Sequence, residues 1–281
     1  MLKGDQAAGL RQNSPSWDTA PRVAVSRGQS PRLSLAITSG KGGVGKTQLA
    51  ANLGVAFAQR GLRTLMMDAD LGLAGLDLAL GVKPEYTLQD VLEGKRTPDD
   101  IVIEGPCGLR LLAACPGRYE MANLTPADRD NLTNAIDECA QNYDILLTDT
   151  GAGINSSSVS FAASADEVIL VATPDPQSMR DAYAMVKVLA KRGGVETIRF
   201  VANQVNSESQ AAELHDTLRG LIRRFLTTEL TYLGCVPRDE VVRMGAASGS
   251  PFLLKSPDGI AARAIQSIVQ RLLALEPSRA A

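Results

Sequence analysis

The sequence predicts an α/β protein built on a mainly parallel, twisted β-sheet with helices on both faces. Short aliphatic runs alternate with stretches of helical periodicity, which is typical of parallel strands joined by crossover helices. The runs are apolar almost throughout, as expected for strands buried on both sides. Hydrophobic residues make up 44% of the 281 residues and aromatic residues 4%. The core is therefore expected to be aliphatic.

Seven aliphatic runs predict the strands. In chain order they cover residues 33–38, 63–68, 109–114, 144–149, 167–172, 198–203 and 231–236. Helical patterns lie between most of them, at 48–60, 127–141, 179–192 and 208–226. The chain has no internal repeat and no sign of a second domain. We expect a single domain over residues 31–281, preceded by a leader over residues 1–30.

The leader differs in composition from the domain. Residues 1–32 carry Lys3, Arg11, Arg22, Arg27 and Arg32 against Asp5 and Asp18, and they are rich in Ser, Pro and Gln. This composition is typical of a disordered arm. The whole chain has a net charge of −2, which gives no electrostatic case for strong nucleic-acid binding.

Cysteine usage and hydropathy indicate the compartment. Cys107, Cys115, Cys139 and Cys235 are scattered, with no C-x-x-C pair and no histidine at metal-binding spacing. We interpret them as reduced thiols. The sequence has neither an apolar run of membrane-spanning length nor a signal-peptide core. The expected location is the cytoplasm.

The segment "GKGGVGKT" follows the first predicted strand and precedes the first helix. It fits the phosphate-binding pattern G-x-x-x-x-G-K-[ST] in the context that this pattern requires. Its glycines let backbone N–H groups converge on phosphate oxygens at a helix N-terminus. Lys46 is expected to reach the β- and γ-phosphates, and the Thr47 hydroxyl to ligate Mg²⁺. The predicted nucleotide-binding residues are Gly40, Lys41, Gly42, Gly43, Val44, Gly45, Lys46, Thr47 and Gln48.

Lys41 is a second lysine in this loop, and "KGGVGKT" resembles the deviant phosphate-binding loop of the MinD/ParA family of ATPases. In that family the first lysine crosses a dimer interface to the nucleotide of the opposite subunit. The resemblance therefore implies an ATP-dependent homodimer, with Lys41 and Lys46 both acting in catalysis. The alternative is that Lys41 is a solvated surface lysine.

Acidic residues follow two of the predicted strands. Asp68 ends the strand at 63–68 and Asp70 follows it by two residues, at the crevice where parallel α/β sheets bind ligands. The family resemblance implies that Asp70 orients the attacking water and that Asp68 supports Mg²⁺ through water. Asp70 would otherwise cap a local turn. Asp149, in "DILLTDTGAGI", is expected to hold Mg²⁺ indirectly, because a buried acid without a partner would be costly.

Further residues are assigned by resemblance alone. Asn203 and the "VPRD" turn, with Pro237 and Asp239, are expected to hold adenine, although both segments also make sense as ordinary strand-ending turns. Gly75 stands where the family usually has Asn, so no contact is assigned to it. Residues 259–276 form an amphipathic helix with Ala261, Ile265, Ile268 and Leu272 on one face. We interpret it as a core helix rather than a membrane anchor and expect weak membrane binding at most.

Three segments resemble the FlhG branch of this family, which regulates flagellar number. They are "TLQDVLEG", "TPDPQSMRDAYAMVKVL" and the leader's "DQAAGLR". The branch carries a D-Q-A-x-x-L-R motif that stimulates FlhF, a GTPase of the signal-recognition-particle type. Such a partner would contact Asp5, Gln6, Ala7, Leu10 and Arg11.

The resemblance leaves several questions of function open. The motif in the leader would otherwise have no function. A flagellar switch-complex protein or a flagellar transcription activator is an open further partner, and recruitment to the cell pole or inner membrane is open too. The alternative functions are positioning of other cargo or of the division site, and ATP-dependent binding with negligible turnover.

Overall fold

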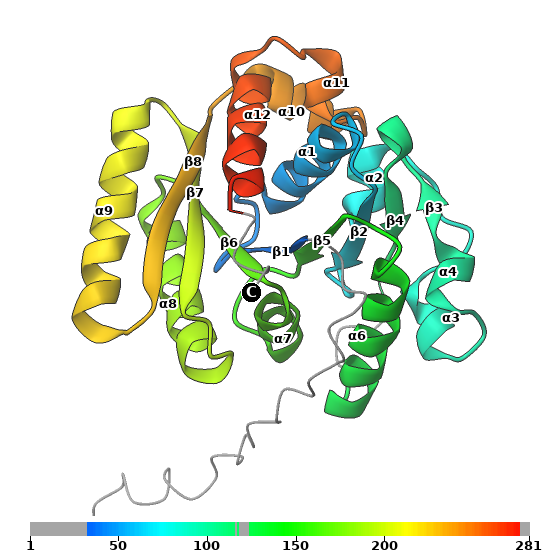
Figure 1. Cartoon of the computed structure of the whole chain (residues 1–281). Helices are drawn as coiled ribbons and strands as arrows, with labels where there is room; N and C mark the ends of the chain where they lie inside the picture. Colours follow the sequence, from blue (N-terminus) through cyan, green and yellow to red (C-terminus); the bar gives the residue numbers. More distant parts are fainter. Residues whose placement is uncertain (1–32, 116, 118–123, 276–281) are drawn as a thin grey trace, which may run out of the picture.

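A computed structural model describes residues 33–115, 117 and 124–275 of the chain (Figure 1). Its centre is an eight-stranded sheet in the order β3-β4-β2-β5-β1-β6-β7-β8. The strands are β1 (Leu33–Thr38), β2 (Thr64–Ala69), β3 (Ile103–Glu104), β4 (Arg110–Leu112), β5 (Ile145–Thr150), β6 (Glu167–Ala172), β7 (Thr197–Val205) and β8 (Glu229–Pro237). All neighbours run parallel except β3 and β4. The predicted α/β class and each of the seven predicted strands are confirmed.

Helices cover both faces of this sheet. One face carries α1 (Lys46–Ala58) and α12 (Ile260–Leu273), whose apolar residues join those of β1 in one core cluster. The other face carries α8 (Pro176–Arg192) and α9 (Glu208–Phe225), which pack on β6, β7 and each other. It also carries α6 (Pro126–Ala140), whose apolar residues belong to a third core cluster. Shorter helices complete the described part: α2 (Leu76–Leu80), α3 (Leu88–Leu92), α4 (Pro98–Ile101), the 3-10 turn η2 (Pro106–Gly108), α7 (Ser156–Ser164), α10 (Glu240–Ala247) and α11 (Phe252–Lys255).

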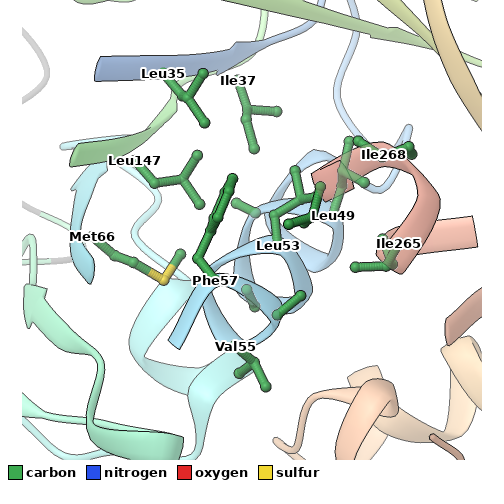
Figure 2. Close-up of a cluster of buried hydrophobic side chains, with 14 of the residues drawn as sticks. Leu35, Ile37, Leu49, Leu53, Val55, Phe57, Met66, Leu147, Ile265 and Ile268 are labelled. Carbon is green, nitrogen blue, oxygen red and sulfur yellow. The ribbon is translucent and has the colours of Figure 1, made fainter. Parts of the chain in front are cut away.

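Alternation along β1 shows how the sequence fills both layers. Leu35 and Ile37 point into the cluster with α1 and α12, whereas Ala36 belongs to the cluster with α8 and α9. Figure 2 shows the first of these clusters, with Phe57 of α1 between the sheet and α12. The close approach of α1 to β2 depends on Gly54, because an added Cβ would lie 2.2 Å from the Met66 sulfur.

Helix α12 tests the interpretation of residues 259–276 as a core helix. In α12 the residues Ala261, Ile265, Ile268 and Leu272 are buried against α1 and β8. The interpretation of this segment as a core helix is confirmed. Among the described residues, no helix has the length and apolar character needed to cross a membrane.

The sequence did not predict β3 or the helices α2 to α4. Strand β3 has two residues and pairs antiparallel with β4 at the edge of the sheet, so it is too short to show any periodicity. The helices have five, five and four residues. The leader, including the motif at residues 5–11, lies outside the described residues.

Candidate nucleotide-binding site

The predicted site residues of the domain gather at the carboxyl edge of the sheet. Strand β1 lies at its centre, between β5 and β6. From β1 the chain crosses through α1 to β2, which lies on one side of β1 beyond β5, whereas β6 lies on the other side of β1. This is the point at which the strand order reverses, and ligands of parallel α/β sheets bind in the crevice outside it. The loop 40–47 leaves β1 here.

Positive φ angles shape this loop. Gly43 has a φ of 78° and Gly45 a φ of 89°, a region that residues with a Cβ rarely adopt. Gly45 is the N-cap of α1, so Lys46 and Thr47 open the helix. A Cβ added at Gly45 would lie 2.4 Å from Asn203 Nδ2. This position therefore requires glycine for two reasons, the backbone angle and the neighbouring amide.

A buried ion pair joins the loop to β5. Lys46 Nζ donates to Asp149 Oδ1 at 2.8 Å, and the two side chains are 6% and 1% exposed. The register places Asp149 opposite Ile37 of β1 and Asp68 of β2. The acid predicted for the metal site thus lies beside the phosphate-binding strand, with the lysine predicted to bind phosphate held against it.

Asp68 organises the loop after β2. Its Oδ1 accepts from the Asp70 N–H at 3.0 Å, and its Oδ2 accepts from the Gly75 and Leu76 N–H groups at 2.9 Å each. Burial, followed by the charge of Asp149, raises the pKa of Asp68 to about 7. Asp68 therefore fixes the loop that carries Asp70 and the start of α2. Its water-mediated role at Mg²⁺ stays a prediction.

Asp70 lies just beyond the strand and beside the loop that follows β5. A Cβ added at Gly151 would come within 3.4 Å of Asp70 Oδ1. The next part of that loop is tied to the phosphate-binding loop, because Gly153 N–H donates to the Ser39 carbonyl at 2.9 Å. Burial raises the pKa of Asp70, and Lys46 opposes this rise. The loops that follow β2 and β5, which carry or adjoin the predicted acidic residues, therefore lie close together at the carboxyl edge of the sheet.

Asn203 braces the phosphate-binding loop from β7. Its Nδ2 donates to the Val44 carbonyl at 2.7 Å, and its Oδ1 accepts from the Gln204 N–H at 2.9 Å. Gln204 has a φ of 58°, at an irregularity in the β7–β8 pairing. This bracing contact was not predicted. The role of Asn203 toward adenine stays a prediction.

Pro237 and Asp239 end β8 next to this brace. Pro237 is the last residue of the strand and lies in register with Val205, two residues after Asn203. Asp239 is the N-cap of α10, where its Oδ1 accepts from the Val241 N–H at 3.0 Å. Both lie at the predicted edge of the sheet. Their contact with adenine also stays a prediction.

Lys41 is held by a residue that the sequence reasoning missed. Its Nζ donates to Asp175 Oδ2, and both side chains are accessible, at 39% and 43% exposed. Asp175 follows β6 and is the N-cap of α8, and the Lys41 ammonium lowers its pKa. The sequence signal that could have found Asp175 is its position as an acidic residue just beyond the strand predicted at 167–172.

The start of the loop also packs closely on α8. A Cβ at Gly40 would lie 2.1 Å from the backbone of Asp181. The first turns of α8 therefore touch the loop both through this backbone contact and through the ion pair of Asp175.

The residues present fit a magnesium-bound nucleotide. Carboxylate and hydroxyl oxygens are the ligands that Mg²⁺ prefers, and Asp149 and Thr47 supply them at this edge. Two buried atoms beside the loop, Thr38 Oγ1 and Gln48 Oε1, have no hydrogen-bond partner within the described part of the chain. Gly42 and Gly43 face open space, with nothing within 4 Å of an added Cβ. The loop thus presents an open cradle with available polar groups.

Comparison with known proteins gives a consistent result. The family model described as the CobQ/CobB/MinD/ParA nucleotide binding domain matches residues 35–252. The chain is 39% identical over 238 residues to the antiactivator FleN of Pseudomonas aeruginosa, covering 85% of each chain. It is 32% identical over 212 residues to the flagellum site-determining protein YlxH of Helicobacter pylori, covering 74% of this chain and 71% of that one.

Solved structures agree with the sequence comparison. The septum site-determining protein MinD of Pyrococcus horikoshii, complexed with Mg-ADP, superposes with a TM-score of 0.72 at 29% identity. The match covers 86% of this chain and 97% of that one. Both the loop geometry and the matched sequence thus lead to the same conclusion. The chain belongs to the MinD/ParA family of P-loop nucleotide-binding proteins.

Proposed function

We propose that this protein is an ATP-hydrolysing switch that dimerises with ATP and regulates the number and placement of flagella. The observation that carries the proposal is the second lysine, Lys41, at the accessible rim of the phosphate-binding loop. Similarity to FleN and to YlxH, a flagellum site-determining protein, supports the flagellar assignment.

The catalytic proposal follows from the side chains at the carboxyl edge. Lys46, which contacts Asp149 in this structure, would exchange that contact for the phosphates, while Thr47 and Asp149 would hold Mg²⁺. When bound, Mg²⁺ would neutralise charge on the β- and γ-phosphates. Asp70 would orient a water against the γ-phosphorus, and the bond to the β-phosphate oxygen would break to give ADP and phosphate. Positioning matters more than proton abstraction in such a loose transition state.

Dimerisation would begin at the ion pair of Lys41. Because Asp175 and Lys41 are both accessible and their contact is at the surface, its strength is small. Lys41 can therefore leave Asp175 for the nucleotide of a second subunit. Two loops facing each other would enclose both nucleotides between the subunits.

Light scattering after size exclusion tests the dimer. With ATP and Mg²⁺ the Asp70→Ala protein is expected to be trapped as a dimer, because hydrolysis is blocked. Lys41→Ala is expected to stay monomeric while retaining nucleotide, and Lys46→Ala to lose nucleotide. Lys191→Ala, an exposed lysine at the far end of α8, is the control. A monomeric Asp70→Ala protein at saturating ATP would refute the proposal, and phosphate release by the unmodified protein measures turnover.

We also propose that the leader stimulates an FlhF-like GTPase through Asp5, Gln6, Ala7, Leu10 and Arg11. In a helix Gln6 and Leu10 lie on one face, with Ala7 and Arg11 beside them. A peptide of residues 1–20 is expected to raise the GTP turnover of an FlhF-like GTPase. Gln6→Ala and Leu10→Ala should abolish that effect without changing ATP-dependent dimerisation. Equal GTP turnover with and without residues 1–20 would refute it.

Positioning of the division site is the alternative, favoured by the similarity to MinD. The two proposals differ in partner. Stimulation of an FlhF-like GTPase supports the flagellar role, whereas a gene deletion that displaces septa and leaves flagella unchanged supports the alternative. In either case we expect the protein to act in the cytoplasm and to reach the pole or inner membrane through partners. A flagellar switch-complex protein or transcription activator is a further candidate partner.

A further inference from the structure

A cavity lies beside the edge strand β8, away from the phosphate-binding loop. Strand β8 ends the sheet, and α9 and α12 pack on opposite faces of it (Figure 1). The cavity lies between β8, the first residues of α9 and one side of α12, and its volume is about 450 Å³. This volume falls within the usual range of small-molecule pockets. We call it the β8–α12 cavity.

Helix α12 lines this cavity with two rows of side chains. The apolar row is Ile260, Ala264 and Ile268, and the polar row is Arg263, Ser267 and Arg271. Successive members of a row are four residues apart, so each row follows one side of the helix. Ile260 is 49% exposed. The protein itself therefore leaves part of the apolar row uncovered.

The two arginines of α12 are oriented without being neutralised. Arg271 Nη1 donates to the Leu233 carbonyl at 2.8 Å, and Arg263 Nη1 donates to the Asp258 carbonyl. Within the described part of the chain, neither guanidinium forms an ion pair with a carboxylate. Each guanidinium has five N–H donors. Most of these donors therefore remain available to an anion.

We propose that the β8–α12 cavity binds a small amphiphile with an anionic head, a carboxylate or a phosphate, and an aliphatic body. The head would accept from the free N–H groups of Arg271, where the strand residue opposite is Gly234 and leaves room. The body would follow the apolar row of α12 toward Pro237, the last residue of β8. Arg263 lies about 12 Å along the helix from Arg271 and would add positive potential at the rim.

Other occupants fit this cavity less well. Addition of a peptide strand uses the free backbone groups of an edge strand. Leu233 is skipped in the β7–β8 register and its carbonyl already accepts from Arg271, while Pro237 has no N–H. A nucleobase stacks best on an aromatic ring, and the described residues that line the cavity include none. An aliphatic chain needs only the aliphatic walls that are present.

The cavity also adjoins the segment that braces the phosphate-binding loop. Val205 lines it and lies two residues after Asn203, whose amide donates to the Val44 carbonyl. The Arg238 N–H donates to the Val205 carbonyl at 2.8 Å. A ligand packed against Val205 and Pro237 would restrict this segment and is expected to strengthen nucleotide binding. This last step rests on the proposed nucleotide site, whereas the cavity itself does not.

Calorimetric titration of the full-length protein without nucleotide tests the cavity. The probe is octanoate below its micelle concentration, and octanol, which has the same chain without the charge, is the control ligand. Octanoate is expected to bind about tenfold more tightly than octanol, the effect of a hydrogen bond to a charged group. Arg271→Gln should reduce octanoate to the affinity of octanol, because it removes the charge and retains an amide donor. Arg243→Gln, which alters an exposed arginine on α10, should leave the affinity unchanged.

A variant that fills the cavity makes the test specific to this place. Ala264→Phe should abolish binding of octanoate, and urea denaturation checks that the variant is folded. Binding of octyl phosphate in place of octanoate supports the site and assigns the head to a phosphate. Equal affinity for octanoate and octanol would overturn the proposal, as would binding that survives Ala264→Phe or no binding of either anion. Arg271-dependent co-sedimentation with phosphatidylglycerol vesicles, without binding of a free amphiphile, would overturn it too.

A second titration separates the cavity from the proposed function. Saturating octanoate is expected to strengthen ATP binding by about fivefold, and ATP should strengthen octanoate binding by the same factor. Asn203→Ala should remove this coupling and retain octanoate binding. Octanoate binding that leaves the affinity for ATP unchanged would overturn the coupling and retain the cavity. Octanoate binding by a protein that neither dimerises nor hydrolyses ATP would refute the proposed function and retain the cavity.

Discussion

Replacing Asn203 with alanine should weaken both the fold and nucleotide binding. The side chain forms two hydrogen bonds, from Nδ2 to the Val44 carbonyl at 2.7 Å and from the Gln204 N–H to Oδ1 at 2.9 Å. Asn203 is 7% exposed and Val44 is 3% exposed, so water replaces these contacts poorly. Each buried group left without a partner costs about 1–3 kcal/mol. With two such groups, we expect the free energy of unfolding to fall by about 2–6 kcal/mol.

The second effect concerns the loop itself. Without the amide, the carbonyl of Val44 is free to rotate, and the loop must be ordered when nucleotide binds. Binding of ATP should therefore weaken in proportion to the population of loop conformations that cannot bind. Binding of inorganic triphosphate should weaken to the same extent, because the Asn203 side chain orders the loop that binds phosphate. A direct contact of Asn203 with adenine would weaken ATP alone.

Asn52 provides a matched control for this experiment. Its side chain is also buried and also forms two hydrogen bonds with backbone groups, to the Gln48 carbonyl at 2.7 Å and from the Leu253 N–H at 2.9 Å. Asn52→Ala should lower the free energy of unfolding by a similar amount, measured by urea denaturation. Calorimetric titration should show weaker triphosphate binding for Asn203→Ala than for Asn52→Ala. Equal affinities of the two variants would refute the bracing argument.

Three further outcomes are expected. Gly45→Ala should abolish nucleotide binding measured by calorimetry. Gly61→Ala, at a φ of 76° with nothing within 4 Å of an added Cβ, should cost only about 1–2 kcal/mol of stability. Asp175→Asn retains a helix cap and removes the charge that holds Lys41, so the ATP concentration at half-dimerisation should fall; an unchanged midpoint in light scattering would contradict this. Because burial raises the pKa of Asp68 to about 7, the native state retains a proton that the unfolded chain releases at lower pH. Stability without nucleotide should therefore decrease as the pH rises from about 4 to about 7, and urea melts of Asp68→Asn should show a shallower slope.

Sequence patterns predicted the parts of the fold that depend on local order. Each strand is an unbroken apolar run and the phosphate-binding loop is a contiguous motif. Both can therefore be recognised without knowing which segments are neighbours in space. The predicted strand at 144–149 put Asp149 at the carboxyl end of a strand, and the structure places that strand beside β1. Strand β3 was missed because two residues carry no period.

Contacts between distant segments could not be predicted in this way. Asn203 lies 159 positions from the Val44 carbonyl that it contacts, and Asp175 lies 134 positions from Lys41. Recognising either pair requires the strand order, in which β6 lies next to β1 and β7 lies next to β6. The packing of α8 against α9 likewise depends on two helices being neighbours, which no periodicity within either helix reveals.

Helix α8 runs from the carboxyl ends of the strands to their amino ends, because it begins after β6 and ends before β7. Its 17 residues span about 25 Å at the usual rise of an α-helix. One end is fixed to the phosphate-binding loop through Asp175 and the backbone contact at Gly40, and the other end carries Lys187 and Lys191. A helix is stiff along its axis, so a displacement of its first turn is expected to move its last turn as well. If Lys41 leaves Asp175 on dimerisation, as proposed, α8 would couple that release to the opposite edge of the sheet, where the helix ends before β7.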